Sequence, residues 1–192
     1  MRNRTVVIGI ILGILFISQP LNANIAVVNI DSDDASGRKL PLGLTEGWQF
    51  TTVDTISVTH LGMWDDYFMV EPPAEIGLLE NSYGFQYEIP IGIWRVSDQS
   101  LVAYTTIGPG IGDLLEDEFR YVEIDPVTLA KDETYVIGFQ WHTSSLLCDW
   151  VRSLKVDEFS VDPSIIFGPG MYNPEAGFLY PDTPDAWQRS HA

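Results

Sequence analysis

The stretch EFRYVEIDPVTLAKDETYVIG, residues 118–138, carries the clearest pattern in the chain. Two apolar runs flank a short polar segment, and Val, Ile, Tyr and Phe are the residue types enriched in β-strands. The pattern predicts two paired strands with a turn at Lys131-Asp132. Pro126 has no backbone N–H to donate, so it predicts a break in the ladder where the first strand bends or shifts to another sheet.

Side chains of this stretch are also expected to build the core. In the second strand, large apolar residues alternate with other residues from Tyr135 to Trp141. This period of two predicts a sheet with one buried face. The expected core side chains are Phe119, Val122, Ile124, Val127, Leu129, Tyr135 and Ile137.

Further strand-like segments recur between clusters of Gly, Pro, Asn and Asp. WQFTT (48–52) and TISVTHLGMW (55–64) are predicted strands joined by a turn at Val53-Asp54. Ile56 and Val58 share one face and Leu61 and Met63 the other, so a bulge or bend is expected near His60. YEIPIGIWRV (87–96) and LVAYTTI (101–107) are predicted partners across an SDQS hairpin, and Pro90 predicts an edge or irregular position.

Two glycine-rich segments, GPGIG (108–112) and FGPG (167–170), are expected to be turns or crossovers. Residues 153–192 are expected to contain the short apolar runs FSV and SIIF and then a Pro- and Gly-rich ending with little regular structure of its own. After the leader, no segment keeps a helical period over three turns. The predicted fold class is therefore all-β, a single antiparallel β-sandwich of jelly-roll type that follows an N-terminal signal helix.

The N-terminus has the layout of a secretory signal peptide. Two arginines precede an uncharged apolar run of about 14 residues, which is short against the roughly 20 needed to span a bilayer. Cleavage is expected after Ala23, with Ala26 as the alternative, leaving no stable membrane span. The predicted divisions are a signal peptide (1–23), a lead-in segment (24–46), the β-sandwich domain (47–180) and an irregular tail (181–192), in a secreted, extracellular or periplasmic protein.

The charge balance limits the class of partner. The 192 residues include 27 acidic and 10 basic side chains, a net charge of −17. Loss of Arg2 and Arg4 with the leader would make it −19. Nucleic acid is a poor partner for such a chain, because phosphate binding requires clustered Lys and Arg. Cys148 is the only cysteine, so an internal disulfide is excluded, and a buried, inert thiol is expected.

Three blocks, GWQFTTVDTISVTHLGMWDD, IPIGIWRVSDQSLVAYTTI and FRYVEIDPVTLAKDETYVIGF, together resemble a domain of uncharacterised function. That domain is common in exported bacterial proteins, many of which carry a C-terminal PEP-CTERM sorting signal. The resemblance covers roughly residues 47–139 and implies a secreted β-sandwich of unknown activity. This chain ends in DAWQRSHA, without the Pro-Glu-Pro motif, so sorting and anchoring are not carried over. Its loop after Trp64 is also longer and more apolar than in such proteins.

The long loop of residues 65–83 is the expected functional segment, since loops of this length inside a compact domain are uncommon and often functional. Its acids Asp65, Asp66 and Glu71 are candidate ligands for a structural calcium ion, the one cofactor that the sequence allows. The spacing of a dedicated calcium loop is absent, so solvated acids are the alternative.

Two tryptophans, Trp64 beside the long loop and Trp187 in the tail, are candidate ligand-binding residues, because exposed aromatic faces stack on sugar rings. No catalytic residue is assigned, since the three histidines lack zinc-site spacing and no nucleophile motif occurs. The expected function is an exported, non-catalytic protein of the bacterial envelope or extracellular matrix, in adhesion or in binding a polysaccharide or other surface ligand. The alternatives are an extracellular hydrolase using acids of the 65–83 loop, and a purely structural surface protein.

Overall fold

The computed structural model describes residues 43–64, 85, 87–116, 119–140, 151–152 and 160–184. Before Gly43 and at 151–152 it describes only the backbone of short strands. All the regular structure in these residues is β, and no helix occurs among them. The predicted all-β class is therefore confirmed for the described part of the chain.

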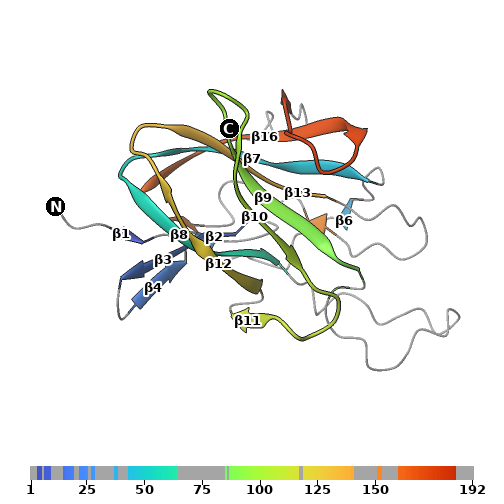
Figure 1. Cartoon of the computed structure of the whole chain (residues 1–192), viewed down its shortest axis with the longest axis horizontal. Coiled ribbons are helices and arrows are strands. Elements are labelled where there is room, and N and C mark those ends of the chain that lie inside the picture. Colours follow the sequence, from blue (N-terminus) through green and yellow to red (C-terminus); the bar gives the residue numbers. More distant parts are fainter. Residues whose placement is uncertain are drawn as a thin grey trace, which may run out of the picture.

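A six-stranded sheet, antiparallel throughout, has the order β10-β9-β13-β7-β16-β17 (Figure 1). Its strands are β7 (Leu44–Thr52), β9 (Ile89–Arg95), β10 (Leu101–Ile107), β13 (Thr134–Gln140), β16 (Ile165–Ala176) and β17 (Thr183–Pro184).

A seven-stranded sheet has the order β11-β12-β8-β2-β3-β4, and β1 also pairs with β8. β1 and β2 run parallel to β8, and the other pairs are antiparallel. Its strands are β1 (Arg4–Thr5), β2 (Val7–Gly9), β3 (Leu15–Gln19), β4 (Asn22–Ile25), β8 (Ile56–Trp64), β11 (Leu114–Glu116) and β12 (Phe119–Leu129). Two short pairs complete the structure: β14 (Val151–Arg152) with β6 (Gly37–Arg38), and β15 (Ser160–Val161) with β5 (Val27–Val28).

Both large sheets contribute to one hydrophobic core. Ile56 and Leu61 of β8 belong to the same buried cluster as Ile91 of β9 and Phe139 of β13, and none of these side chains is accessible to solvent. Burial of such residues contributes roughly 1.5–3 kcal/mol each to folding, so this cluster holds the two sheets together.

The irregularities predicted at Pro126 and near His60 are both confirmed, and they lie opposite each other. Glu123 pairs with His60, but the next register pair joins Val127 to Val58, so three residues of β12 face only Thr59. The alternation of β8 slips at the same point, where Thr59 and His60 are both half-buried. Ile56 and Val58, and also Leu61 and Met63, are therefore all buried in the core, although the simple period of two places the pairs on opposite faces.

The predicted pairing of the two strands in residues 118–138 is wrong. β12 pairs with β11 and β8, whereas β13 lies between β7 and β9 in the other sheet. The turn at Lys131-Asp132, where Asp132 has a φ of 59°, therefore connects two sheets. Val53 and Asp54 likewise join strands of different sheets, since β7 and β8 do not pair.

Burial of the predicted core side chains agrees with the expectation. Phe119, Leu129, Tyr135 and Ile137 are buried, and Val122, Ile124 and Val127 are partly buried against them. The single buried face predicted for β13 is wrong, because Val136 and Gly138 on the other face are also buried. The ring of Trp94 and the methyl group of Thr45 lie over Gly138.

The predicted hairpin between β9 and β10 is confirmed, with a bulge between Leu101 and Ala103. Gln99, with a φ of 57°, lies in its turn, and the N–H of Arg95 donates to the carbonyl of Ser100. Pro90 does not mark an edge, since β9 is an inner strand. The pairing of β9 with β13 begins one residue later, at Ile91, so that ladder does not need the N–H that Pro90 lacks.

The C-terminal part is more regular than expected. β16 has 12 residues and is the longest strand, and its FGPG segment forms a register shift between Phe167 and Gly170 rather than a turn. The GPGIG segment is a connection, as predicted, in which the N–H of Gly110 donates to the carbonyl of Phe85.

The predicted signal helix of residues 1–23 falls where only β1, β2, β3 and the start of β4 are described, and the rest of it lies outside the described residues. The signal peptide and its cleavage site therefore stay predictions. Among the described residues, no helix is long and apolar enough to cross a membrane.

Candidate functional site

The site residues predicted from the sequence lie almost entirely outside the described residues. This holds for Asp65, Asp66, Glu71 and Trp187, and of Trp64 only the backbone is described, at the end of β8 opposite Phe119. In the described part of the chain, no group of three or more His, Cys, Asp and Glu side chains is placed to hold a metal ion. The candidate site must therefore be built from other residues.

An aromatic surface, composed of Trp94, Leu101, Tyr104 and Phe178, lies on the six-stranded sheet. A row of glycines makes room for it: Gly92, Gly138 and Gly47 are register partners on β9, β13 and β7. Side chains occupy the space above two of them, since a Cβ on Gly92 would lie 2.9 Å from Leu101 and 3.1 Å from Phe178, and one on Gly138 would lie 3.2 Å from Trp94. A Cβ on Gly47 would instead meet the backbone of β13. Glycine in a strand commonly marks such a close approach.

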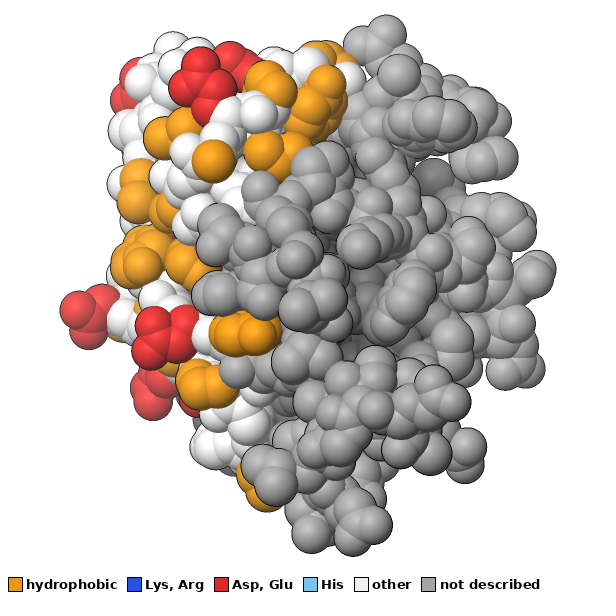
Figure 2. Space-filling model, turned by 90° about the vertical axis from the view of Figure 1, so that its right-hand side faces the viewer, with side chains coloured by type: hydrophobic (Ala, Val, Ile, Leu, Met, Phe, Trp, Pro, Cys, Tyr) orange, Lys and Arg blue, Asp and Glu red, His pale blue; other side chains and the backbone are white. Residues whose placement is uncertain are grey.

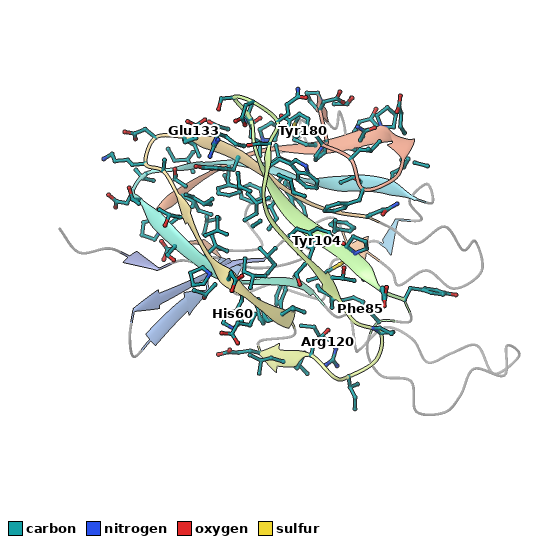
Figure 3. All side chains as sticks on the ribbon, in the orientation of Figure 1. His60, Phe85, Tyr104, Arg120, Glu133 and Tyr180 are labelled. Carbon is teal, nitrogen blue, oxygen red and sulfur yellow. The ribbon has the colours of Figure 1, made fainter. Side chains whose placement is uncertain are left out.

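The three rings of the aromatic surface form a continuous contact chain. The centroids of Trp94 and Phe178 are 4.8 Å apart at 44°, and those of Phe178 and Tyr104 are 5.3 Å apart at 61°. Both separations lie in the favourable range for aromatic pairs. Trp94 is only 4% exposed whereas Tyr104 is 51% exposed. Trp94 therefore supports the cluster, and Tyr104 presents it to solvent from β10 (Figure 3).

Phe178 is held in place by hydrogen bonds on both sides of it in the chain. The buried Thr45 hydroxyl donates to the carbonyl of Gly177 over 2.7 Å and accepts from the N–H of Leu179 over 2.9 Å. The side-chain amide of Asn173 donates to the carbonyl of Tyr180 over 2.8 Å. Gly177 has a φ of 130°, a conformation that favours glycine. A ring fixed in this way loses little freedom when a ligand binds.

Polar groups border the aromatic surface. The hydroxyls of Tyr104 and Thr106 are 3.1 Å apart and hydrogen-bonded. At the hairpin end, Asp98 accepts hydrogen bonds from the N–H and hydroxyl of Ser100, and from Arg95 over 3.0 Å. The bonds from Ser100, followed by the charge of Arg95, lower the pKa of Asp98. The carboxylate is therefore ionised near neutral pH.

This combination suits ligand binding. An aromatic ring open to solvent can stack on the apolar face of a sugar, and hydroxyls can exchange hydrogen bonds with it. The described residues of the aromatic surface include no histidine or cysteine that could act as a base or nucleophile. The chemistry available from Tyr104, Thr106 and Ser100 is stacking and hydrogen bonding.

The sequence patterns did not indicate Trp94, Tyr104 or Phe178 as candidate site residues. Gly92, two residues before Trp94, and Gly138, directly before Phe139, were a usable signal for this surface. An isolated glycine in a strand indicates close approach of another group. Phe178 gave no signal of its own, since it follows a Pro- and Gly-rich stretch and reaches the sheet only through tertiary contacts.

His60 lies with acidic residues on the seven-stranded sheet. Its side chain is half-buried, as expected for a strand residue on a partly buried face. Its Nδ1 is 3.0 Å from the Thr59 hydroxyl, and its register partner on β12 is Glu123. Burial lowers the pKa of His60, although the charges of Glu123 and Glu116 partly oppose this effect. The imidazole is therefore mostly neutral at pH 7.

No family model, curated protein or solved structure matches this chain. The likeness to the uncharacterised domain of exported bacterial proteins therefore stays a proposal.

Proposed function

We propose that this chain is an exported, non-catalytic protein that binds a polysaccharide through its aromatic surface. The observation that carries the proposal is the position of Tyr104, half-exposed on β10 and backed by Phe178 and the buried Trp94. Sugar rings present apolar C–H faces that stack on exposed aromatic rings, with hydroxyl groups at their rims. Thr106 and Ser100 supply hydroxyls beside the surface.

The proposed architecture is a β-sandwich of jelly-roll type. Its support is the single core that both large sheets share, together with two connections, β7 to β8 and β12 to β13, that pass from one sheet to the other. Sandwiches of this kind expose one face of each sheet, and such a face is where the aromatic surface lies.

The proposed location is the bacterial envelope or extracellular matrix. It is supported by the signal-peptide pattern, by the net charge of −17 and by the likeness to domains of exported bacterial proteins. On the face in Figure 2, the described side chains are hydrophobic, acidic or neutral, with no Lys or Arg visible among them. That surface favours neutral or cationic ligands over nucleic acid.

The test is binding of a glycan panel, comprising insoluble cellulose, xylan and chitin and their soluble oligosaccharides, measured by pull-down and calorimetry. We expect Tyr104→Ala to weaken binding about tenfold, which corresponds to about 1.4 kcal/mol. Tyr104→Phe keeps the ring and should retain most of the affinity. Leu114→Ala, an exposed apolar change on the other sheet, is the matched control.

The outcomes separate the proposal from its alternatives. Equal affinity of Tyr104→Ala and the unchanged chain would place any glycan site elsewhere. Release of reducing sugar during incubation would favour a hydrolase acting through the 65–83 loop. Absence of binding to every glycan would favour a purely structural surface protein. Calcium at Asp65, Asp66 and Glu71 is tested separately by thermal unfolding with Ca²⁺ or EDTA, because an ion that binds only the native state raises its stability.

A further inference from the structure

β11 is an edge strand of the seven-stranded sheet (Figure 1), and side chains on both of its faces are exposed. Leu114 is 56% exposed and Leu115 is 48% exposed, although consecutive strand residues point to opposite faces. Ile111, just before the strand, is exposed as well. Within the described residues, β11 pairs with β12 on one side and with no strand on the other.

An edge of this kind is a template for a further strand. Edge strands present backbone N–H and C=O groups, and proteins commonly protect them with Lys, Pro or a covering segment. β11 carries neither Lys nor Pro, and its two leucines are open to solvent. An added strand would gain backbone hydrogen bonds and would bury both leucines.

The backbone leading into β11 is fixed before any partner binds. The buried Arg120 donates from Nη1 to the carbonyl of Asp113 over 3.2 Å, and the Asp113 carboxylate accepts from the N–H of Gly108 over 2.7 Å. Leu115 of β11 and Arg120 of β12 are register partners, so Arg120 supports β11 from the adjacent strand. A pre-organised edge loses less entropy when it binds a strand.

Charge favours a cationic strand over a second copy of this chain. If a second copy paired antiparallel with β11, with Leu114 of each copy opposite Leu115 of the other, Asp113 of each copy would lie opposite Glu116 of the other. Like charges directly opposite one another destabilise a strand pair. The net charge of −17 adds a general repulsion between copies. A strand with Lys or Arg near Glu116 has neither penalty.

We propose that β11 is a docking edge for an extended, cationic and amphipathic strand of a partner protein. The partner pairs with the backbone of β11, covers Leu114 and Leu115 with apolar side chains, and places Lys or Arg near Glu116. This site is separate from the aromatic surface and does not depend on glycan binding.

The experiment measures fluorescence anisotropy of a labelled ten-residue peptide of alternating Lys and Val on addition of the full chain. We expect saturable binding that weakens as salt is added, because exposed charges are screened. Leu115→Lys should weaken binding at least tenfold, since it removes apolar contact and adds a like charge. Ile166→Lys also places a lysine at an exposed apolar position, here on β16 at a side chain that is 60% exposed, and should leave binding unchanged.

Two further peptides exclude simple charge attraction. A Lys–Val peptide with N-methyl groups on alternate residues keeps its charge but loses backbone donors, so we expect no binding. A Glu–Val peptide should also fail to bind. The proposal is overturned if the N-methylated peptide binds as well as the unmodified one, if Leu115→Lys and Ile166→Lys behave alike, or if the Lys–Val peptide does not bind.

Discussion

Thr52 links the two connections between the sheets, and replacing it with Val should show how much that link contributes to stability. Its buried hydroxyl lies 2.5 Å from the carbonyl of Ala130 and 3.1 Å from that of Glu133. Its own carbonyl accepts from the N–H of Asp132 over 2.8 Å, and its N–H donates to Glu133 over 3.1 Å. The end of β7 is thereby fastened to the turn between β12 and β13.

Thr52→Val keeps the shape of the side chain and removes the hydroxyl. Glu133 retains the bond from the backbone N–H of residue 52, but the carbonyl of Ala130 loses its donor from that residue. Ala130 is exposed, so water can replace the donor that its carbonyl loses. The cost is then that of one net hydrogen bond, about 0.5–1.5 kcal/mol, and we expect the free energy of unfolding to fall by about 1 kcal/mol. At roughly 2–4 °C per kcal/mol for a chain of this size, Tm should fall by about 2–4 °C.

The assay is urea unfolding followed by tryptophan fluorescence, with thermal unfolding as a second measure. Thr51→Val is the matched control, because the half-buried Thr51 hydroxyl bonds only to that of Thr134 among the hydrogen bonds described for it, and we expect a loss below about 0.5 kcal/mol. Thr52→Ser keeps the hydroxyl and should lose about 1 kcal/mol for its methyl group. If Thr52→Val is no less stable than Thr51→Val, the Thr52 hydroxyl does not fasten β7 to this turn.

Two other predictions concern the backbone and pH. Gly47→Ala should lower the free energy of unfolding by about 3 kcal/mol, because the new Cβ would collide with the carbonyl of Ile137 and lie 2.6 Å from the Cα of Gly138. At Gly112 a new Cβ would have no atom within 4 Å, so Gly112→Ala should change the free energy of unfolding by less than about 0.5 kcal/mol. Chemical denaturation of the two variants measures both changes. His60 has a lowered pKa, so the unfolded chain binds more protons than the folded chain between that pKa and 6.5, and stability falls as pH drops through this window. His60→Gln should reduce that fall, and identical stability profiles of the two chains between pH 7.5 and 5 would contradict the assignment.

Local signals in the sequence predicted many strands and their irregularities correctly. Turn residues around Asp98 indicated the hairpin, and the missing N–H of Pro126 and the phase slip near His60 indicated one bulge from its two sides. Each of these features depends on a few consecutive residues, so the backbone preferences of those residues suffice to predict it. The candidate site was not predictable in this way, since Tyr104 and Phe178 are 74 residues apart and meet only across the folded sheet.

Residue types and their spacing are enough to predict the all-β class, the acidity, the alternation of core side chains and the position of the turn at Lys131-Asp132. They do not predict that this turn joins two sheets, because a hairpin and a connection between sheets need similar turn residues. The choice between them depends on which distant strands cover the apolar faces. Here β8 pairs with β12 while β7 and β9 enclose β13, and burial on both faces of β13 follows from that long-range pairing.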